Sequence, residues 1–483
     1  MVDQSTNIWN PLNASLFASL ALSAFATAVP VALVTPMSND LFQVEYTGNN
    51  GGNEDVTTSV VTAFAPRVAG AAVLGTSFGK FLNGPMGDVL GARRTSIIYS
   101  LFMTMSLVML ACARTSETVV RACFLVEFTY SVLWPCCVIT LATHYRGDSH
   151  GMYEGGVYIT SLAARIGSLI GIPCCALLLR HFHWRFVALI GAWSSLVASS
   201  VSYLYVEDSP GKRNDPQNPI DESLLQKCYP DYIRRRKRPS FGVILRMAPS
   251  VIWMNVVPSV KHILSSGTFW CVSIAHTGAS MVRTSERVLG TYLYETSNNS
   301  LSENRAAGLS VFLSVGTVAG LVVAGSIFAS RQDRERKWMI SRLYILTIVS
   351  CYVLAFLAIP SVRNFVKAPE LVSTFQVIAI AFSGFGIAVQ FYHIPSLVGA
   401  TFGCDKGLFS SYTDGVAYGI ASFVWRIVGD VVQHGSSDGG GWSYGWAAVA
   451  LLLIPSAILM VEFMEHYFCR HRYGGTYETI IFA

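Results

Sequence analysis

Residues 84–94 read G-P-M-G-D-V-L-G-A-R-R, and they separate two apolar segments of membrane-spanning length, 59–83 and 95–113. Glycine permits the tight turn that two closely packed helices need between them. An aspartate beside basic residues or a helix N-terminus can fasten such a turn. We therefore expect a conformational latch on one side of a membrane. The residues expected to form it are Gly84, Asp88, Gly91, Arg93 and Arg94.

The composition of the whole chain is that of a membrane protein. Of its 483 residues, 52% are hydrophobic and 13% are charged, whereas an ordinary soluble domain has about 25% charged residues. This argues against soluble enzymes, secreted disulfide scaffolds, nucleic-acid binders and disordered proteins. The 11 cysteines lie mostly inside apolar segments without metal-ligand spacing. We interpret them as packing residues and expect no metal site.

Twelve apolar segments are long enough to cross a bilayer, for which about 20 residues are needed. Only helices satisfy all backbone polar groups in hydrocarbon, so we predict an all-α membrane protein with twelve transmembrane helices. Six spans, a polar linker and six more spans are typical of two pseudo-symmetric six-helix bundles around a central site. The predicted spans are 12–36, 59–83, 95–113, 118–143, 152–179, 186–205, 263–293, 306–330, 338–359, 371–399, 407–432 and 442–464.

The same pattern divides the chain into four units. They are an N-terminal bundle over 1–206, a cytoplasmic central linker over 207–262, a C-terminal bundle over 263–464 and a cytoplasmic tail over 465–483. Within the linker, Phe241–Val260 is fairly apolar but contains an arginine and two prolines. We favour an interfacial stretch over a thirteenth span for this segment.

Charge placement predicts the orientation and the partners. Loops on one side of the predicted helices carry most of the Lys and Arg residues, which places both termini in the cytoplasm. The densest basic run, R-R-R-K-R at 234–238, is typical of a loop facing anionic lipid rather than nucleic acid. We expect a monomer whose partners are the lipid bilayer and a small anionic substrate.

The loop at 84–94 resembles the signature loop of the major facilitator superfamily, where a glycine, an aspartate four residues later, another glycine and a basic pair recur. It departs from that pattern at Val89, where the family usually has arginine. Further stretches resemble the organophosphate:phosphate antiporters of this superfamily, which include glycerol-3-phosphate and glucose-6-phosphate translocases. These stretches are G-K-F at 79–81, W-P-C-C at 134–137, H-W-R-F at 183–186 and T-Y-L at 291–293.

The antiporter resemblance implies a phosphate clamp with one arginine in the first span and one in the seventh. Arg283 is the counterpart of the seventh-span arginine, but the first predicted span, 12–36, contains neither Lys nor Arg. Half of the implied clamp is therefore missing. An organic anion remains as plausible a substrate as an organophosphate.

Charged side chains inside the predicted spans indicate function, because a charge at the centre of a membrane helix costs at least about 2.5–3.5 kcal/mol. Arg165 lies near the middle of the fifth predicted span. An arginine there can grip a carboxylate or phosphate through two parallel hydrogen bonds; the alternative is a structural ion pair. The residues expected to bind substrate are Arg165, Arg283, Lys80, His276, Tyr130, Trp134, Tyr392 and His393.

Three acidic residues in the predicted spans, Glu127, Asp414 and Glu286, are candidates for proton coupling. Burial favours the protonated form of a carboxylate, so such a group can carry a proton across the membrane. Glu127 and Asp414 are equally able to act as the counter-ion of a basic residue. Glu286 can neutralise Arg283 or Arg287, which lie on nearly the same helix face. If the seventh helix ends early, Glu286 and Arg287 are interfacial instead. The sequence leaves these roles open.

These features together predict a secondary active transporter that moves a small anionic solute by alternating access, through exchange or ion coupling. The chain has no G-x-x-x-x-G-K-[ST] loop for ATP, so we expect no cofactor and no enzymatic activity. One alternative keeps the fold and makes the protein a proton-coupled carrier of peptides, amino acids or other carboxylates. Another is a non-transporting receptor on a transporter fold.

Overall fold

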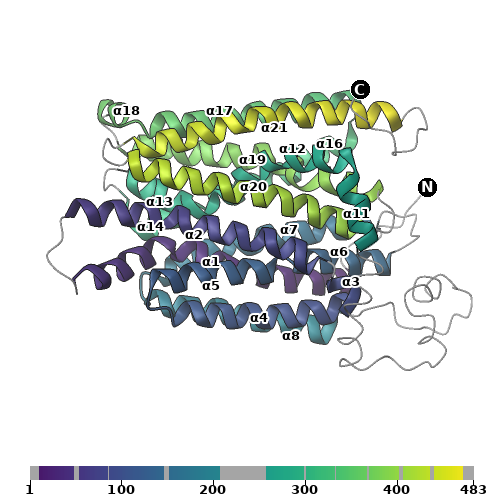
Figure 1. Ribbon diagram of the computed structural model, residues 1–483, viewed down its shortest axis with the longest axis horizontal. Helices are drawn as coiled ribbons and strands as arrows, with labels where there is room; N and C mark the ends of the chain where they lie inside the picture. Colours follow the sequence, from purple (N-terminus) through teal and green to yellow (C-terminus); the bar gives the residue numbers. More distant parts are fainter. Residues whose placement is uncertain are drawn as a thin grey trace, which may run out of the picture.

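The computed structural model describes residues 10–47, 54–84, 86–145, 152–206, 257–297, 301–331, 333–366, 369–401, 406–435 and 440–471. Within these ranges the chain is helical and has no strands. The long helices run side by side along the long axis of the molecule (Figure 1). We name the two ends of the bundle after short helices found there. The α3 end, on the right of Figure 1, holds α3 (Met86–Leu90) and α11 (Val257–Ser265), and the α18 end holds α18 (Pro360–Phe365).

The N-terminal half is a bundle with its own core. Its long helices are α1 (Pro11–Thr47), α2 (Glu54–Asn83), α4 (Ala92–Ala111), α5 (Ser116–Tyr130), α6 (Leu133–His144), α7 (Met152–Leu178) and α8 (Trp184–Tyr205). Helix α1 packs on α7 and α8, α4 packs on α8, and α2 packs on α5. Their apolar side chains form one buried cluster that extends from Leu16 to Val206.

The C-terminal half repeats this arrangement. Its helices are α12 (Gly267–Thr284), α13 (Glu286–Thr296), α14 (Glu303–Leu309), α15 (Phe312–Ala319), the π-helical turn η3 (Gly320–Gly325), α16 (Ser326–Ser330), α17 (Asp333–Leu357), α19 (Pro369–Thr401), α20 (Lys406–Gly435) and α21 (Gly441–His471). Helix α12 packs on α20 and α21, α17 packs on α19 and α21, and α15 packs on α19. The second core extends from Ile263 to Met464 and includes Ala69 and Val73 of α2.

The two halves meet along a few helix pairs. Helix α2 packs against α20, and α7 contacts α14 and α15, while α1 contacts α13 and α14. Small residues permit this approach: a Cβ added at Gly84 would lie 2.8 Å from the Ser411 Oγ of α20 and 2.7 Å from the carbonyl oxygen of Lys80. Gly84 therefore lies at a close contact between the two halves.

The loop at 84–94 contains a second position that requires glycine. Gly91 has φ 88° and ψ 140° at the start of α4, a conformation that is essentially restricted to glycine. Arg93 follows in the first turn, donates a hydrogen bond to the carbonyl of Tyr203, and lies 5.6 Å from the centre of its ring. This contact ties the loop to α8. The side chain of Asp88, and with it the expected aspartate pairing, lies outside the described side chains.

The prediction of an all-α fold with twelve membrane-length segments in two halves is confirmed in outline. Among the described residues, ten segments are long and apolar enough to cross a membrane. The second and seventh predicted spans, α2 and α12–α13, are not among those ten but also follow the axis of the bundle (Figure 1). Of the linker, only residues from 257 onward are described. They begin α11, so most of Phe241–Val260 lies outside the described residues.

Three predicted spans differ from single straight helices. The fourth is divided into α5 and α6 around residues 131–132, just before Pro135, which cannot donate a hydrogen bond to the carbonyl of Ser131. The seventh is interrupted at Ser285, and the eighth contains a π-helical turn. In addition, the first predicted span is longer than expected, because α1 continues to Thr47. The fourth and seventh spans both carry charged residues that line the interface between the halves, Glu127 on α5 and Arg287 on α13.

Candidate substrate cavity

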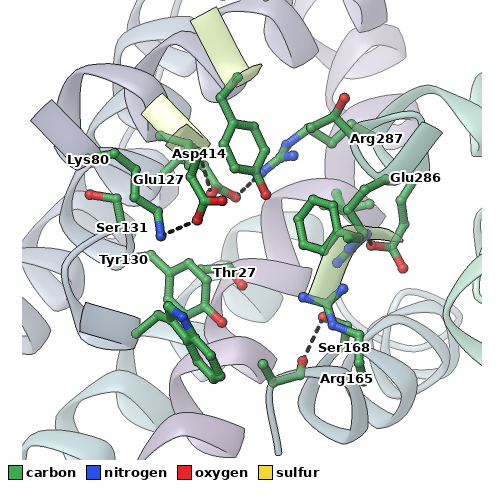
Figure 2. Close-up of a pocket in the computed structure, with 18 of the residues that line it drawn as sticks. Thr27, Lys80, Glu127, Tyr130, Ser131, Arg165, Ser168, Glu286, Arg287 and Asp414 are labelled. Atoms are coloured by element: carbon green, nitrogen blue, oxygen red, sulfur yellow. Dashed lines mark hydrogen bonds and ion pairs between the residues drawn. The ribbon is translucent and has the colours of Figure 1, made fainter. Parts of the chain in front are cut away.

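A cavity of about 120 Å³ lies between the two halves (Figure 2). The N-terminal half contributes Thr27, Ala28, Val31, Thr76, Lys80, Glu127, Tyr130, Ser131, Trp134, Ala164, Arg165 and Ser168. The C-terminal half contributes Arg283, Thr284, Glu286, Arg287, Phe391, Tyr392, Ser410, Asp414 and Tyr418. Because both halves form its walls, relative movement of the halves would change the shape and access of the cavity.

One ion pair joins the halves across α2 and α20. Lys80 Nζ lies 2.9 Å from Asp414 Oδ2, and the Lys80 residue is only 6% exposed. His276 of α12 is fully buried, and its Nε2 lies 3.2 Å from Asp414 Oδ1. Lys80 therefore points into the cavity instead of extending to the membrane surface. Asp414 acts as its counter-ion.

The position of Lys80 depends on the close approach of α2 to α5. A Cβ added at the preceding residue, Gly79, would lie 2.6 Å from the carbonyl oxygen of Phe128 and 2.1 Å from Ser131 Oγ. Only glycine allows the two helices to come this close. On the other side, the Ser411 hydroxyl donates a hydrogen bond of 2.9 Å to the carbonyl of Lys80. These contacts fix the backbone from which the lysine extends.

A second ion pair joins the halves with the opposite polarity. Arg287 of α13 pairs with Glu127 of α5, and Glu127 also accepts a hydrogen bond of 3.1 Å from Thr76 Oγ1. Glu127 is 6% exposed. Figure 2 shows Glu127, Arg287, Lys80 and Asp414 gathered in the same part of the cavity. Glu127 is therefore a counter-ion in this conformation.

A third pair lies within the C-terminal half. Arg283 pairs with Glu286 across the interruption at Ser285, and Glu286 also accepts a hydrogen bond of 2.5 Å from Ser314 Oγ of α15. Because the helix is interrupted, Arg283 and Arg287 reach different carboxylates and both line the cavity. The seventh span is therefore embedded in the protein throughout its charged part.

Arg165 of α7 differs from the other basic residues of the cavity. It is only 8% exposed, and it forms no ion pair with any residue that the structure describes. Its Nε and Nη1 atoms are buried and have no hydrogen-bond acceptor there. Its guanidinium lies over the ring of Tyr392, with Cζ 5.4 Å from the ring centre. Arg165 is thus a buried cation held by an aromatic face, with donors left unused.

The backbone of α7 is held close to α1 near Arg165. A Cβ added at Gly167 would lie 2.3 Å from the carbonyl oxygen of Ala21. This approach fixes the height and direction of the α7 backbone. Arg165 lies two residues earlier in the same helix, and its side chain extends towards Tyr392 of α19 in the opposite half.

The structure brings most of the predicted binding residues to one cavity. Lys80, Tyr130, Trp134, Arg165, Arg283 and Tyr392 line it, as do the three acidic candidates. His276 stands behind Asp414 and against Phe391, with the ring centres 4.9 Å apart. The side chain of His393 lies outside the described side chains.

Other lining residues were not predicted to bind substrate. Arg287 lies in the seventh predicted span, but its pairing with Glu127 depends on a contact between segments far apart in the sequence. Tyr418 lies four residues after Asp414 on α20, so helical spacing would have placed both on one face. Thr76, Ser131 and Ser168 carried no comparable signal, because small hydroxyl residues are common in membrane helices.

The described residues contain no cluster of three or more His, Cys, Asp or Glu side chains placed to hold a metal ion. Apart from Arg165, the charged groups that line the cavity are arranged instead as pairs of opposite sign. Such an arrangement can bind an ion or solute by exchanging one partner for another.

Two six-helix halves around a shared, charged cavity define the class of alternating-access membrane transporters. A sequence model of the Major Facilitator Superfamily matches residues 12–429, and the chain belongs to this superfamily. The superfamily resemblance of the 84–94 loop is thereby confirmed. No curated protein matches the sequence.

Solved transporters share the fold at low sequence identity. A D-xylose–proton symporter has a TM-score of 0.62 at 12% identity, covering 92% of this chain and 96% of that chain. A partially occluded inward-open conformation of the xylose transporter XylE from E. coli has a TM-score of 0.62 at 14% identity, covering 95% and 98%. The nucleoside transporter NupG has a TM-score of 0.53 at 15% identity, covering 94% and 99%. At these identities the similarity is one of fold.

Proposed function

We propose that this transporter moves a small anionic solute through the cavity between its halves. The observation that carries the proposal is Arg165, a buried cation without a carboxylate partner among the described residues. A buried charge of this kind is costly unless a ligand pairs with it. The arginine is therefore a specific point of attachment for an anion.

The charge balance of the cavity supports the same conclusion. Its basic side chains are Lys80, Arg165, Arg283 and Arg287, and its acidic side chains are Glu127, Glu286 and Asp414. One positive charge is in excess when all of these groups are ionised. A bound anion removes this excess, whereas a cation or a neutral sugar leaves it in place.

Exchange of phosphate and organophosphates is the form of the proposal that the sequence resemblance implies. It rests on the resemblance of the G-K-F and W-P-C-C stretches, whose Lys80 and Trp134 both line the cavity. The first-span arginine of the implied clamp has no equivalent, because α1 contributes only Thr27, Ala28 and Val31. Arg165 would have to replace it.

Counterflow into proteoliposomes tests the proposal. Liposomes containing the purified protein are preloaded with phosphate, and uptake of labelled phosphate and then of sugar phosphates is measured. Any anion that exchanges should be exchanged by Arg121→Ala and not by Arg165→Ala, because Arg121 is an exposed arginine of α5. Anion transport that is unaffected by Arg165→Ala would overturn the role assigned to this residue.

Proton-coupled uptake of a carboxylate is a second candidate, favoured by the surroundings of Asp414. Its carboxylate contacts both Lys80 and the buried His276, so a proton could pass between ionisable groups that link three helices. Uptake that is driven by an inward proton gradient, and lost in Asp414→Asn, would support this candidate. Uptake that needs internal anion and ignores the gradient would support exchange.

We also propose that the α3 end faces the cytoplasm. The start of α4 and the start of α17 lie at this end (Figure 1). They carry the basic residues Arg93, Arg94, Arg334, Arg336 and Lys337, a pattern typical of cytoplasmic loops. A cysteine introduced as Arg94→Cys should react with a membrane-impermeant reagent only after the membrane is opened. Reaction of the introduced cysteine in sealed cells would show that the α3 end faces the outside.

A further inference from the structure

The charge that the solute must carry follows from the pairing of the carboxylates. Asp414 forms an ion pair with Lys80, Glu127 with Arg287, and Glu286 with Arg283. Arg165 is the basic residue left over among those that line the cavity. One negative charge balances it. A second charge on the same solute would be buried without a counterpart, which is unfavourable at low dielectric.

The shape of the solute follows from the apolar part of the walls. Among the described residues, aliphatic lining is limited to Ala28, Val31 and Ala164. The remaining apolar surface is aromatic, contributed by Tyr130 and Trp134 of the N-terminal half and by Phe391, Tyr392 and Tyr418 of the C-terminal half. Rings therefore face the cavity from both halves. They surround a volume of about 120 Å³, which suits one small molecule.

The rings of the C-terminal half are arranged edge to face beside the free arginine. Phe391 and Tyr392 have ring centres 4.7 Å apart at 70°, and Phe391 and Tyr418 have centres 6.4 Å apart at 80°. Arg165 lies over the Tyr392 ring. Aromatic groups prefer such offset and edge-to-face partners. A ring attached to the anionic group that pairs with Arg165 would extend this cluster.

We propose that the solute is an aromatic monocarboxylate, with its carboxylate on Arg165 and its ring among the aromatic side chains of the two halves. This inference rests on the proposed function and specifies its substrate class. It also separates the chain from the organophosphate exchangers that two of its motifs resemble. A phosphomonoester carries about 1.5 to 2 negative charges at pH 7, more than the cavity balances.

Calorimetric titration of the purified, detergent-solubilised protein provides the test, using four matched probes. Benzoate has the proposed charge and ring, and cyclohexanecarboxylate keeps the charge without the aromatic ring. Phenyl phosphate keeps the ring with more charge, and benzyl alcohol keeps the ring without charge. At about pH 7 we expect benzoate to bind at least about fivefold more tightly than cyclohexanecarboxylate, the size expected of one aromatic contact. Phenyl phosphate and benzyl alcohol should bind more weakly than benzoate.

Two variants assign the binding to the proposed contacts. Tyr392→Leu should remove the preference for benzoate over cyclohexanecarboxylate, and Arg165→Gln should abolish binding of both carboxylates. Phe356→Leu is the matched control, because Phe356 is 56% exposed on α17 and lies away from the cavity lining. It should bind benzoate as the unaltered protein does.

The outcomes separate the inference from the proposed function. Equal binding of the two carboxylates, or tighter binding of phenyl phosphate than of benzoate, in each case lost in Arg165→Gln, would overturn the aromatic monocarboxylate and leave an anion transporter. If neither these probes nor inorganic phosphate bind through Arg165, the proposed function fails as well. Benzoate preference lost in Tyr392→Leu and retained in Phe356→Leu supports the inference.

Discussion

Arg287 of α13 forms an ion pair with Glu127 of α5, and this pair joins the two halves of the transporter at the wall of the cavity. Lys80 of α2 and Asp414 of α20 form a second such pair, in which the N-terminal half supplies the cation. Alternating access requires the halves to rock around the site between them. These two pairs therefore stabilise the conformation seen in the structure. The rocking of the halves must break them or exchange their partners.

The Arg287–Glu127 pair gives the first prediction. Arg287→Gln leaves a buried carboxylate without its cation, and breaking a buried pair in this way costs about 3–5 kcal/mol. We expect a clear fall in the thermal unfolding midpoint of the detergent-purified protein. Combining Arg287→Gln with Glu127→Gln should recover much of the loss, since no charge is then left unpaired.

The exposed Glu117–Arg121 pair on α5 is the control for this comparison. Both of its side chains are more than half exposed, and such a pair contributes about 0–1 kcal/mol. Glu117→Gln should therefore leave the unfolding midpoint almost unchanged. If Arg287→Gln were as mild as Glu117→Gln, the interdomain pair would not stabilise this conformation.

The Lys80–Asp414 pair predicts opposite effects of two substitutions on anion affinity. Lys80→Met removes the positive excess of the cavity, and Asp414→Asn enlarges it by one charge. We expect the affinity for benzoate to fall in the first and rise in the second, by about tenfold each, as for one unit charge a few ångströms away in a partly desolvated site. Titration calorimetry measures both, and the double variant should lie between them. Changes in the same direction would contradict the charge balance.

Close packing of α2 on α5 gives the third prediction. Gly79→Ala would place a Cβ 2.6 Å from the Phe128 carbonyl oxygen, so a helix must shift, at a cost of about 1–3 kcal/mol. Gly70→Ala on the same helix meets only an ordinary contact, 3.7 Å from the Ser422 carbonyl oxygen. We expect Gly79→Ala to lower the unfolding midpoint and Gly70→Ala to leave it nearly unchanged. Equal midpoints would show that this approach does not constrain α2.

Much of the fold was predictable because hydrocarbon imposes simple rules. Spans such as 95–113 and 186–205 coincide closely with α4 and α8, since long apolar segments have no alternative to helix in a membrane. The break at Ser285 was not predicted. No proline or glycine marks it, whereas the pair of Arg283 and Glu286 across it, three residues apart in the sequence, is one that helical spacing allows.

The candidate site was predictable as a set of residue types but not as a set of partners. The cost of intramembrane charge identified Arg165, Lys80, Glu127 and Asp414 from the sequence alone. Their pairing depends on which helices of opposite halves lie together, such as α2 against α20. Residue spacing within one helix carries no information about this. The distinction between the unpaired Arg165 and the paired Arg283 therefore required the structure.

The most direct test of the role proposed for Arg165 is anion counterflow in Arg165→Ala. Arg121→Ala is the matched arginine control, and protein-free liposomes correct for leakage. Labelled phosphate, glycerol 3-phosphate and benzoate are each tested with the unaltered protein, and the transported anion is then used for both variants. We expect Arg165→Ala to abolish counterflow, while its unfolding midpoint and yield stay close to those of Arg121→Ala. Undiminished counterflow in Arg165→Ala would show that this unpaired arginine does not bind the solute.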